Sequence, residues 1–222
     1  HFKNGTVGVV GGKAVHQRSP KERDEPVKLD TLTIDIGASS KAEAEKYVSP
    51  GDCAYFRSDY TELGNGYLRE KALDDRIGCA IMVDILNKNL PYDVTCVFTV
   101  QEEIGTRGAK VAAYTVKPDY AIVLETTTAC DFSGNDGEKL GKGCVVSYMD
   151  RSTIYDRELY RLGFEKAKEI NVPCQTKTLV AGGNDSGAIH SSVGGIRTVA
   201  LSVPCRYLHS PSCMIKKSDV HF

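Results

Sequence analysis

The stretch Val94-Thr-Cys-Val-Phe-Thr-Val-Gln-Glu-Glu-Ile-Gly105 decides the fold, because a run rich in β-branched residues leads straight into Gln101 and two glutamates. The run predicts a strand over residues 94–100. Two other apolar runs have the same form: Ala121-Ile-Val-Leu ends in Glu125, and the run from Thr198 to Val203 leads into a turn that contains His209. In open α/β sheets, ligands bind beyond the carboxyl ends of the strands. We therefore expect three strands to bring these polar side chains to one edge of a sheet.

Residues 67–222 alternate between helical and strand patterns. Apolar residues at helical spacing predict a helix that starts at Leu73 and ends near Asn89, ahead of Pro91. Further helices are expected over residues 155–170 and 185–192, and further strands over residues 143–148 and 176–180. This alternation predicts an α/β domain in which a mixed sheet is covered by helices.

Residues 1–66 have a different pattern, which is rich in expected strands. Leu32, Ile34 and Ile36 alternate with polar residues, as in a half-buried strand. The sequence Ser40-Lys-Ala-Glu43 is a capping box that predicts a short helix. Gly64-Asn-Gly66 then marks the expected boundary between a small β-rich domain and the α/β domain.

Composition excludes several classes of protein. The 222 residues carry a net charge of -1 and no basic cluster, so a nucleic-acid surface is not expected. No apolar run is long enough to cross a bilayer, so no membrane partner is expected. The eight cysteines form no Cys-x-x-Cys pair, which favours free thiols in a reducing cytoplasm over a structural zinc site. The first residues resemble the second half of a strand and Lys217–Phe222 the start of a helix, so we expect an internal segment of a longer protein.

The acids at the sheet edge suit a divalent transition metal, because zinc accepts Asp, Glu and His ligands at about 2.0–2.2 Å. Adjacent glutamates after a strand point in different directions, so one can bind an ion while the other accepts a proton from the attacking water. Each feature alone has an ordinary explanation, such as the helix macrodipole for Asp74 and Asp75 at a helix start. Glu125 differs, because a carboxylate directly after Ile-Val-Leu needs partners if it is buried. Together these residues favour a metal site.

Four motifs in this order and spacing resemble those of the M42 family of metallo-aminopeptidases. They are Lys71-Ala-Leu-Asp-Asp-Arg-Ile-Gly78, Glu102-Glu-Ile-Gly105, Gly182-Gly-Asn-Asp185 and Arg206-Tyr-Leu-His-Ser-Pro211. Gly8-Val-Val-Gly-Gly12 and Ile34-Asp-Ile-Gly-Ala38 resemble the small β-domain inserted into that fold. The resemblance implies a zinc-peptidase-like catalytic domain with an inserted β-barrel-like domain over residues 1–66.

The resemblance also implies a role for individual residues. Asp74 matches the carboxylate that bridges two metal ions, and Asp75 matches its less essential neighbour. Glu103 and His209 each match a ligand to one metal ion. Glu102 matches the general base that takes a proton from the attacking water.

This chain departs from the family pattern at two places. Glu125 occupies a position where the family has Asp, so we expect a ligand with a longer reach. The upstream His-x-Asp motif of the family has no counterpart, and neither His1 nor His16 fits it. We therefore expect that these 222 residues alone do not complete a two-metal site. The Gly182–Asp185 loop is expected near the substrate or as a helix cap, and His190 is expected to be structural.

The function implied is removal of N-terminal residues from peptides with two divalent ions, zinc or cobalt, in a homo-oligomer that is a tetrahedral dodecamer by resemblance. Two alternatives stay open. One is a catalytically inactive family member that serves as an assembly scaffold. The other is a glycoside hydrolase, whose paired carboxylates flank a sugar bond about 5–9.5 Å apart.

Overall fold

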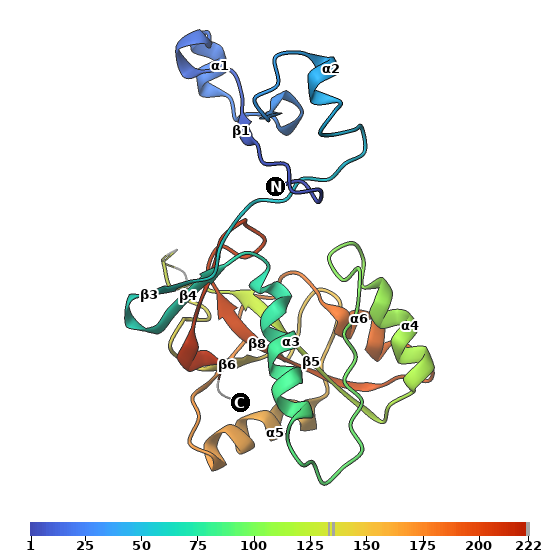
Figure 1. Ribbon diagram of the computed structural model, residues 1–222. Helices are drawn as coiled ribbons and strands as arrows, with labels where there is room; N and C mark the ends of the chain where they lie inside the picture. The colour runs from blue at the N-terminus through green and yellow to red at the C-terminus, as the bar shows by residue number, and fades with distance from the viewer. Residues whose placement is uncertain (133, 135, 221–222) are drawn as a thin grey trace. The chain divides into compact units, whose positions relative to one another are not determined.

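A computed structural model describes residues 1–132, 134 and 136–220. The chain divides into two compact units, His1–Arg57 and Ser58–Phe222, which are drawn from blue to red in Figure 1. The Gly64–Gly66 turn, which the sequence suggested as a boundary, joins two paired strands, β3 (Thr61–Leu63) and β4 (Tyr67–Glu70).

The first unit contains short elements and no fully buried residue. Strands β1 (Val9–Gly11) and β2 (Thr33–Asp35) pair antiparallel, and the helices are α1 (Pro20–Asp24) and α2 (Lys41–Ala44). The Ser40 hydroxyl caps α2 by accepting the Glu43 N–H, as the capping box predicts. Among the described residues this unit forms one two-stranded ladder and no closed barrel, so the expected barrel-like form is not confirmed.

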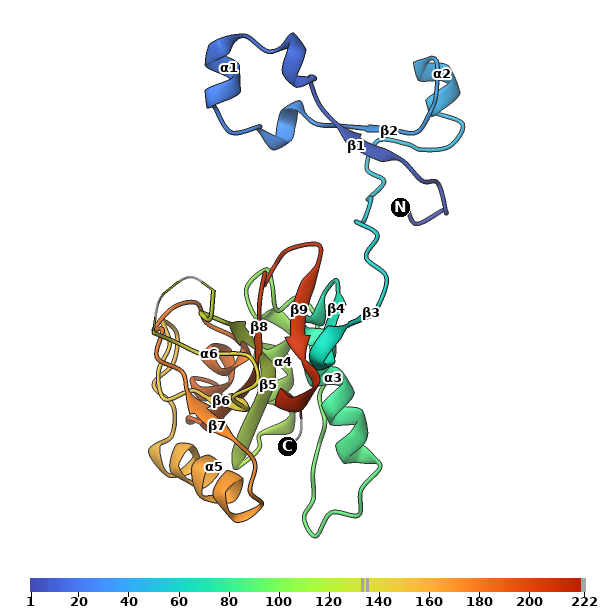
Figure 2. The same cartoon turned by 90° about the vertical axis from the view of Figure 1, so that its left-hand side faces the viewer.

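The second unit holds two sheets. In the larger sheet the strand order is β5-β8-β6-β7, with β5 parallel to β8, β8 antiparallel to β6, and β6 parallel to β7. The bounds are Tyr120–Thr128 for β5, Cys144–Val146 for β6, Cys174–Thr176 for β7 and Arg197–Cys205 for β8. The smaller antiparallel sheet joins β3, β4 and β9 (Cys213–Lys216), which lie beside the larger sheet in Figure 2. The mixed sheet and its helices confirm the expected α/β class.

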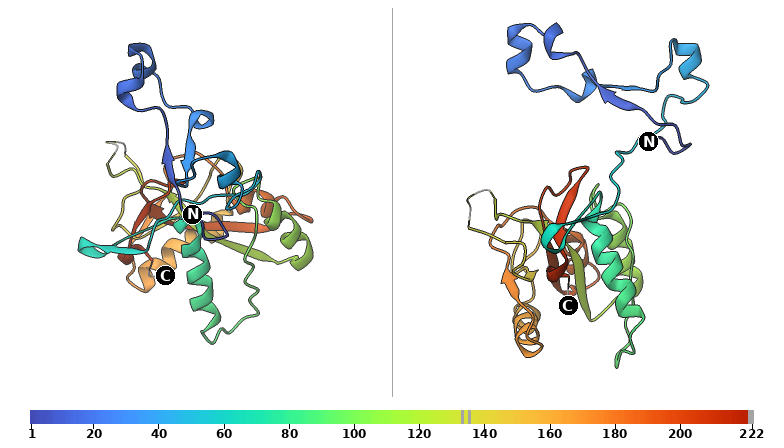
Figure 3. Two further views of the ribbon diagram at one scale, coloured as in Figure 1. Left: turned by 45° about the horizontal axis from the view of Figure 1, so that its top comes forward. Right: turned by 60° about the vertical axis from the view of Figure 1, so that its left-hand side comes forward.

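Three helices of this unit pack against the strands, and a fourth packs against another helix. They are α3 (Leu73–Leu86), α4 (Arg107–Val116), α5 (Arg157–Glu169) and α6 (Asp185–His190). Helix α4 contacts α6. Helix α3 contacts β5 and β9, whereas α5 contacts β8 and β6. The right-hand view of Figure 3 shows α3 and α5 on opposite sides of β5. The core between α3 and the strands includes Leu73, Ile81, Val203, Cys205 and Ile215.

The strand expected over residues 94–100 is wrong. Residues 93–99 make no β-ladder with any described residue, and the side chains of Val94 and Phe98 are exposed. A β-branched run becomes a strand only when another strand supplies hydrogen-bond partners, and no described strand does so here.

The other expected helices and strands of the second unit are present with shifted ends, except the strand expected over residues 176–180. Strand β7 shares only Thr176 with that range, and residues 177–180 form no strand. Strand β5 is longer than the apolar run because Glu125 to Thr128 continue the pairing with β8. Helix α5 begins where the Asp156 carboxylate accepts the backbone N–H groups of Glu158 and Leu159, both at 2.9 Å. Among the described residues, no helix combines the length and the apolar character that crossing a bilayer requires.

Candidate metal centre

Two aspartates open α3 in a conformation that is not helical. Asp74 and Asp75 are joined by a cis peptide bond. The Asp75 Oδ1 accepts the Gly78 N–H at 3.0 Å, and a Cβ on Gly78 would lie 2.3 Å from the Asp75 Oδ2. Glycine at position 78 therefore allows the Asp75 carboxyl to fold back onto the helix.

Asp74, Glu103 and His209 meet although they are far apart in the sequence. One ligand atom from each lies within 4.8 Å of the others. The His209 Nε2 is 3.3 Å from the Asp74 Oδ2 and 3.7 Å from the Glu103 Oε2. Asp74 is mostly buried, whereas Glu103 and His209 are exposed. These three residues, called the ligand triad below, offer the carboxylate and imidazole donors that zinc and similar ions bind.

The turn that carries His209 is held by its neighbours. Arg206 donates two hydrogen bonds to the Asp131 carboxylate, at 2.9 and 2.6 Å. The Ser210 N–H donates to the Tyr207 carbonyl at 3.0 Å. Tyr207 and His209 both have positive φ, which places the imidazole at a tight bend of the chain.

Glu102 lies next to the ligand triad in the sequence and is half-buried. Burial raises the pKa of its carboxyl to about 7, with further contributions from the charges of Asp185, Glu103 and Asp74, and the charge of His209 acts in the opposite direction. Neither of its oxygens belongs to the triad. A carboxyl with such a pKa can exchange a proton near neutral pH.

Glu125 lies on β5 outside the ligand triad. Its Oε1 accepts hydrogen bonds from the Asn184 Nδ2 at 2.6 Å and from the Ser202 Oγ at 3.2 Å. Burial raises the pKa of the Glu125 carboxyl to about 8, and the charge of Lys177 opposes that rise. The charge of Asp74 also raises this pKa, so Glu125 and the triad act on each other electrostatically.

The centre crowds several carboxyl groups together, and a bound cation would favour their ionised forms. Burial raises the pKa of Asp75 to about 8, with the charges of Asp74, Glu102 and Asp185 adding to it. Burial also raises the pKa of Asp185, whose Oδ1 has no hydrogen-bond partner among the described residues. Carboxylates crowded in this way bind divalent ions readily, so the residues present fit a metal centre.

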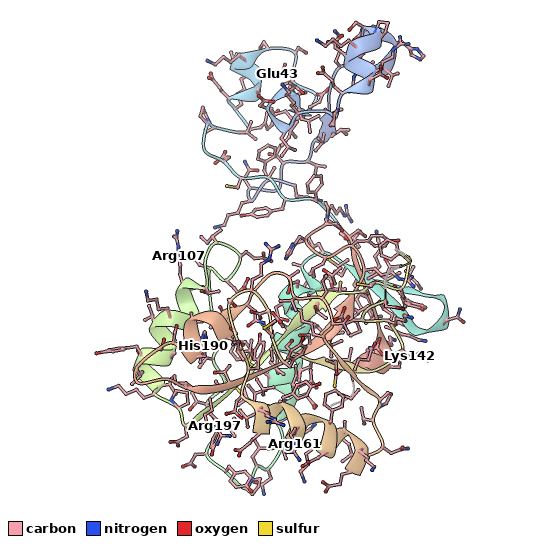
Figure 4. All side chains as sticks on the ribbon, turned by 180° about the vertical axis from the view of Figure 1, so that it is seen from behind. Glu43, Arg107, Lys142, Arg161, His190 and Arg197 are labelled. Atoms are coloured by element: carbon pink, nitrogen blue, oxygen red, sulfur yellow. The ribbon has the colours of Figure 1, made fainter. Side chains whose placement is uncertain are left out.

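Two site predictions concern α6. The Asn184 Oδ1 caps this helix by accepting the Ser186 N–H at 2.8 Å, as the capping prediction required. His190, labelled in Figure 4, places its Nδ1 2.8 Å from the Ser186 carbonyl oxygen, which agrees with a structural role.

The sequence did not identify Asp150 and Tyr155, which are connected to Glu125 by hydrogen bonds that pass through Asn184. The Tyr155 hydroxyl donates to the Asp150 Oδ2 at 2.5 Å and accepts from the Asn184 Nδ2 at 2.9 Å. No spacing rule connects a loop tyrosine to an asparagine 29 residues later. They come together because α6, which Asn184 caps, packs against β5 and β8, while β6, which precedes the Asp150 turn, pairs with β8.

Comparisons with known proteins agree with one another. The family model for M42 glutamyl aminopeptidases matches residues 1–221. A putative aminopeptidase of Acetivibrio thermocellus is 42% identical over 99% of this chain and 66% of its own length. A TET aminopeptidase crystal structure from a marine sediment archaeon of the Thaumarchaeota has a TM-score of 0.91 at 33% identity, covering 99% of this chain and 65% of that one.

The TET1 peptidase of Pyrococcus horikoshii, described as able to assemble into a tetrahedron or a large octahedral shell, has a TM-score of 0.78 at 34% identity. That match covers 91% of this chain and 62% of that one. The chain thus spans less than two thirds of the length of each of these relatives.

Proposed function

The chain belongs to the M42 glutamyl aminopeptidase family, and we propose that this protein is a metal-dependent aminopeptidase that removes N-terminal residues from peptides. The observation that carries the proposal is the ligand triad of Asp74, Glu103 and His209, with ligand atoms within 4.8 Å of one another. A glutamate whose pKa is raised to about 7, Glu102, directly precedes the triad member Glu103. Together they supply metal ligands and a proton acceptor at one place.

The proposed cofactors are two divalent ions, zinc or cobalt. The ligand triad would hold one ion, and Asp74 together with Glu125 would contribute to holding the other. When bound, such ions polarise a peptide carbonyl and lower the pKa of an attacking water. The excess of buried acid around Asp75 and Asp185 supports a centre that binds more than one positive charge.

Glu102 is the proposed general base and general acid. Its carboxylate would accept a proton from the attacking water and return it to the nitrogen of the leaving peptide. The raised pKa makes the first transfer easier, because a carboxylate whose conjugate acid has a pKa of about 7 is a stronger base than an ordinary glutamate. The neighbouring charges of Asp185 and Asp74 sustain this pKa.

The remaining parts of the proposal concern organisation. Residues 67–222 would form the catalytic domain and residues 1–66 the inserted barrel-like domain. A homo-oligomer is supported by the TET1 relative, which assembles into a shell, and a dodecamer is the proposed form. A cytoplasmic location is supported by cysteines such as Cys144, Cys205 and Cys213, which are present as thiols and not as disulfides.

One observation favours an inactive scaffold as the second candidate. The Glu125 Oε1 already accepts hydrogen bonds from Asn184 and Ser202, so this carboxylate has partners without any ion. Under that alternative the fold and the assembly persist while turnover is absent.

The deciding experiment measures the full-length protein, stripped with a chelator and reloaded with zinc, cobalt or manganese. Hydrolysis of a panel of aminoacyl p-nitroanilides that depends on the added metal supports the proposal. A correctly folded, metal-loaded protein without turnover favours the scaffold. Chelator-insensitive cleavage of a β-glucan would instead identify a glycoside hydrolase.

A further inference from the structure

A chain of buried hydrogen bonds ends on Glu125, and its member Asn184 also caps α6. It begins at Asp150, in the turn between β6 and α5, and passes through Tyr155 and Asn184. The exposed fractions of these three residues are only 5%, 5% and 3%. Buried polar groups are stabilising only when they are satisfied, so a connected chain of this kind points to a role at its end.

The direction of each hydrogen bond is fixed by chemistry. An ionised Asp150 carboxylate can only accept, so the Tyr155 hydroxyl must donate to it. The Tyr155 oxygen then accepts one N–H of the Asn184 amide at 2.9 Å, and the other N–H goes to the Glu125 Oε1 at 2.6 Å. The amide cannot be reversed, because the Ser186 N–H needs the Asn184 oxygen at 2.8 Å.

Asp150 is itself anchored. Its Oδ1 accepts the backbone N–H groups of Ser152 and Thr153 at 2.7 and 2.8 Å, and the Ser152 hydroxyl at 2.9 Å. A carboxylate with this many donors has little freedom to move, so the position of the Tyr155 hydroxyl is determined by the turn.

This chain of hydrogen bonds occupies one of the two carboxylate oxygens of Glu125. The Ser202 hydroxyl, from the residue paired with Glu125 in the parallel β5–β8 ladder, donates to the same Oε1 at 3.2 Å. In the described part of the chain, no residue donates to the Glu125 Oε2. The carboxylate therefore presents one oxygen that is free and one that is held.

We propose that Asn184, braced by Tyr155 and Asp150, is a positioning residue that fixes Glu125 so that only its Oε2 is available to a metal ion. The inference rests on the proposed function, in which Glu125 is a ligand. It adds that the longer side chain at this position is held in place by an amide that donates to it. Groups that orient a ligand in this way typically change metal affinity by about 10–100-fold when they are removed.

The test uses calorimetric titration of the metal-free, full-length protein with zinc. Asn184→Ser and Asn184→Asp both keep a side-chain oxygen that can cap α6 but lose the N–H groups. Tyr155→Phe removes only the hydroxyl that orients the amide. Tyr160→Phe is the matched control, because its hydroxyl pairs with Thr176 at 2.8 Å and not with this chain of hydrogen bonds.

We expect two ions to bind to the unmodified protein, and the weaker ion to lose about 10–100-fold in affinity in both Asn184 variants. Tyr155→Phe should act in the same direction with a smaller effect, and Tyr160→Phe should leave both affinities unchanged. Wild-type affinities in both Asn184 variants, with two ions bound, would overturn the positioning role alone. Fewer than two ions on the unmodified protein would overturn this inference together with the proposed two-ion centre.

Discussion

The change Glu102→Gln separates proton transfer from metal binding. The amide has nearly the same shape but cannot accept a proton, and residue 102 is not a member of the ligand triad. The wild-type carboxyl has its pKa raised to about 7, first by burial and then by Asp185, Glu103 and Asp74. In the metal-free protein such a group exchanges a proton near neutral pH, and bound ions would lower its pKa.

The expected loss of rate follows from the proposed role of Glu102 as general base. A positioned general base contributes about 10²- to 10⁴-fold to the rate, which corresponds to about 3–5 kcal/mol at about 1.4 kcal/mol for each tenfold change. Glu102→Gln should therefore reduce kcat by that factor, leave the metal content unchanged by elemental analysis, and abolish the acidic limb of the pH profile at or below pH 7. Glu165→Gln, on the exposed surface of α5, is the matched control. Retention of kcat within about tenfold of wild type would exclude Glu102 from the base role.

Three further predictions test the rest of the centre. Glu103→Ala and His209→Ala should each lower both the metal occupancy and the activity, and unchanged stoichiometry in both would mean that the site is misplaced. Glu125→Asp should retain turnover but change the relative activity with zinc, cobalt and manganese, whereas wild-type behaviour with every metal would show that Glu125 does not touch the ions. In metal-free protein the pKa values of Asp75 and Glu102 are raised to about 8 and about 7. The folded state therefore holds these protons more firmly than the unfolded chain. The free energy of unfolding, measured by urea titration, should fall as the pH rises from about 5 to about 8. A free energy that stays constant over this range would refute the assignment.

Local sequence patterns were enough for most elements of the second unit. The His209 turn follows the carboxyl end of β8, as expected, whereas Glu125 lies within β5, which continues to Thr128. The sequence also predicted the helices that became α3 and α5, because the apolar spacing of each, and for α5 the Asp156 cap, lies within the segment itself.

Segments whose state depends on a distant partner were not predictable. Residues 94–100 have strand composition, yet no described strand pairs with them. The turn at Gly64–Gly66 has the composition of a linker, but it joins β3 to β4, and β4 also pairs with β9, more than 140 residues later in the chain. Strand formation requires hydrogen-bond partners, and the sequence of a single segment does not identify the strand with which it will pair.

The candidate metal centre shows the same division between what the sequence determines and what the fold determines. The sequence by itself determined which residue types stand beyond the strands, and through the four motifs it determined the family and the candidate ligands Asp74, Glu103 and His209. Only the tertiary structure decided which of them meet, because a distance of 3.3 Å between His209 and Asp74 depends on how β8, its following turn and α3 pack. It also decided that Glu125 stands apart from the triad and is held by Asn184. Hydrogen bonds and charge effects fall off within a few ångströms, and folding alone determines which side chains come that close.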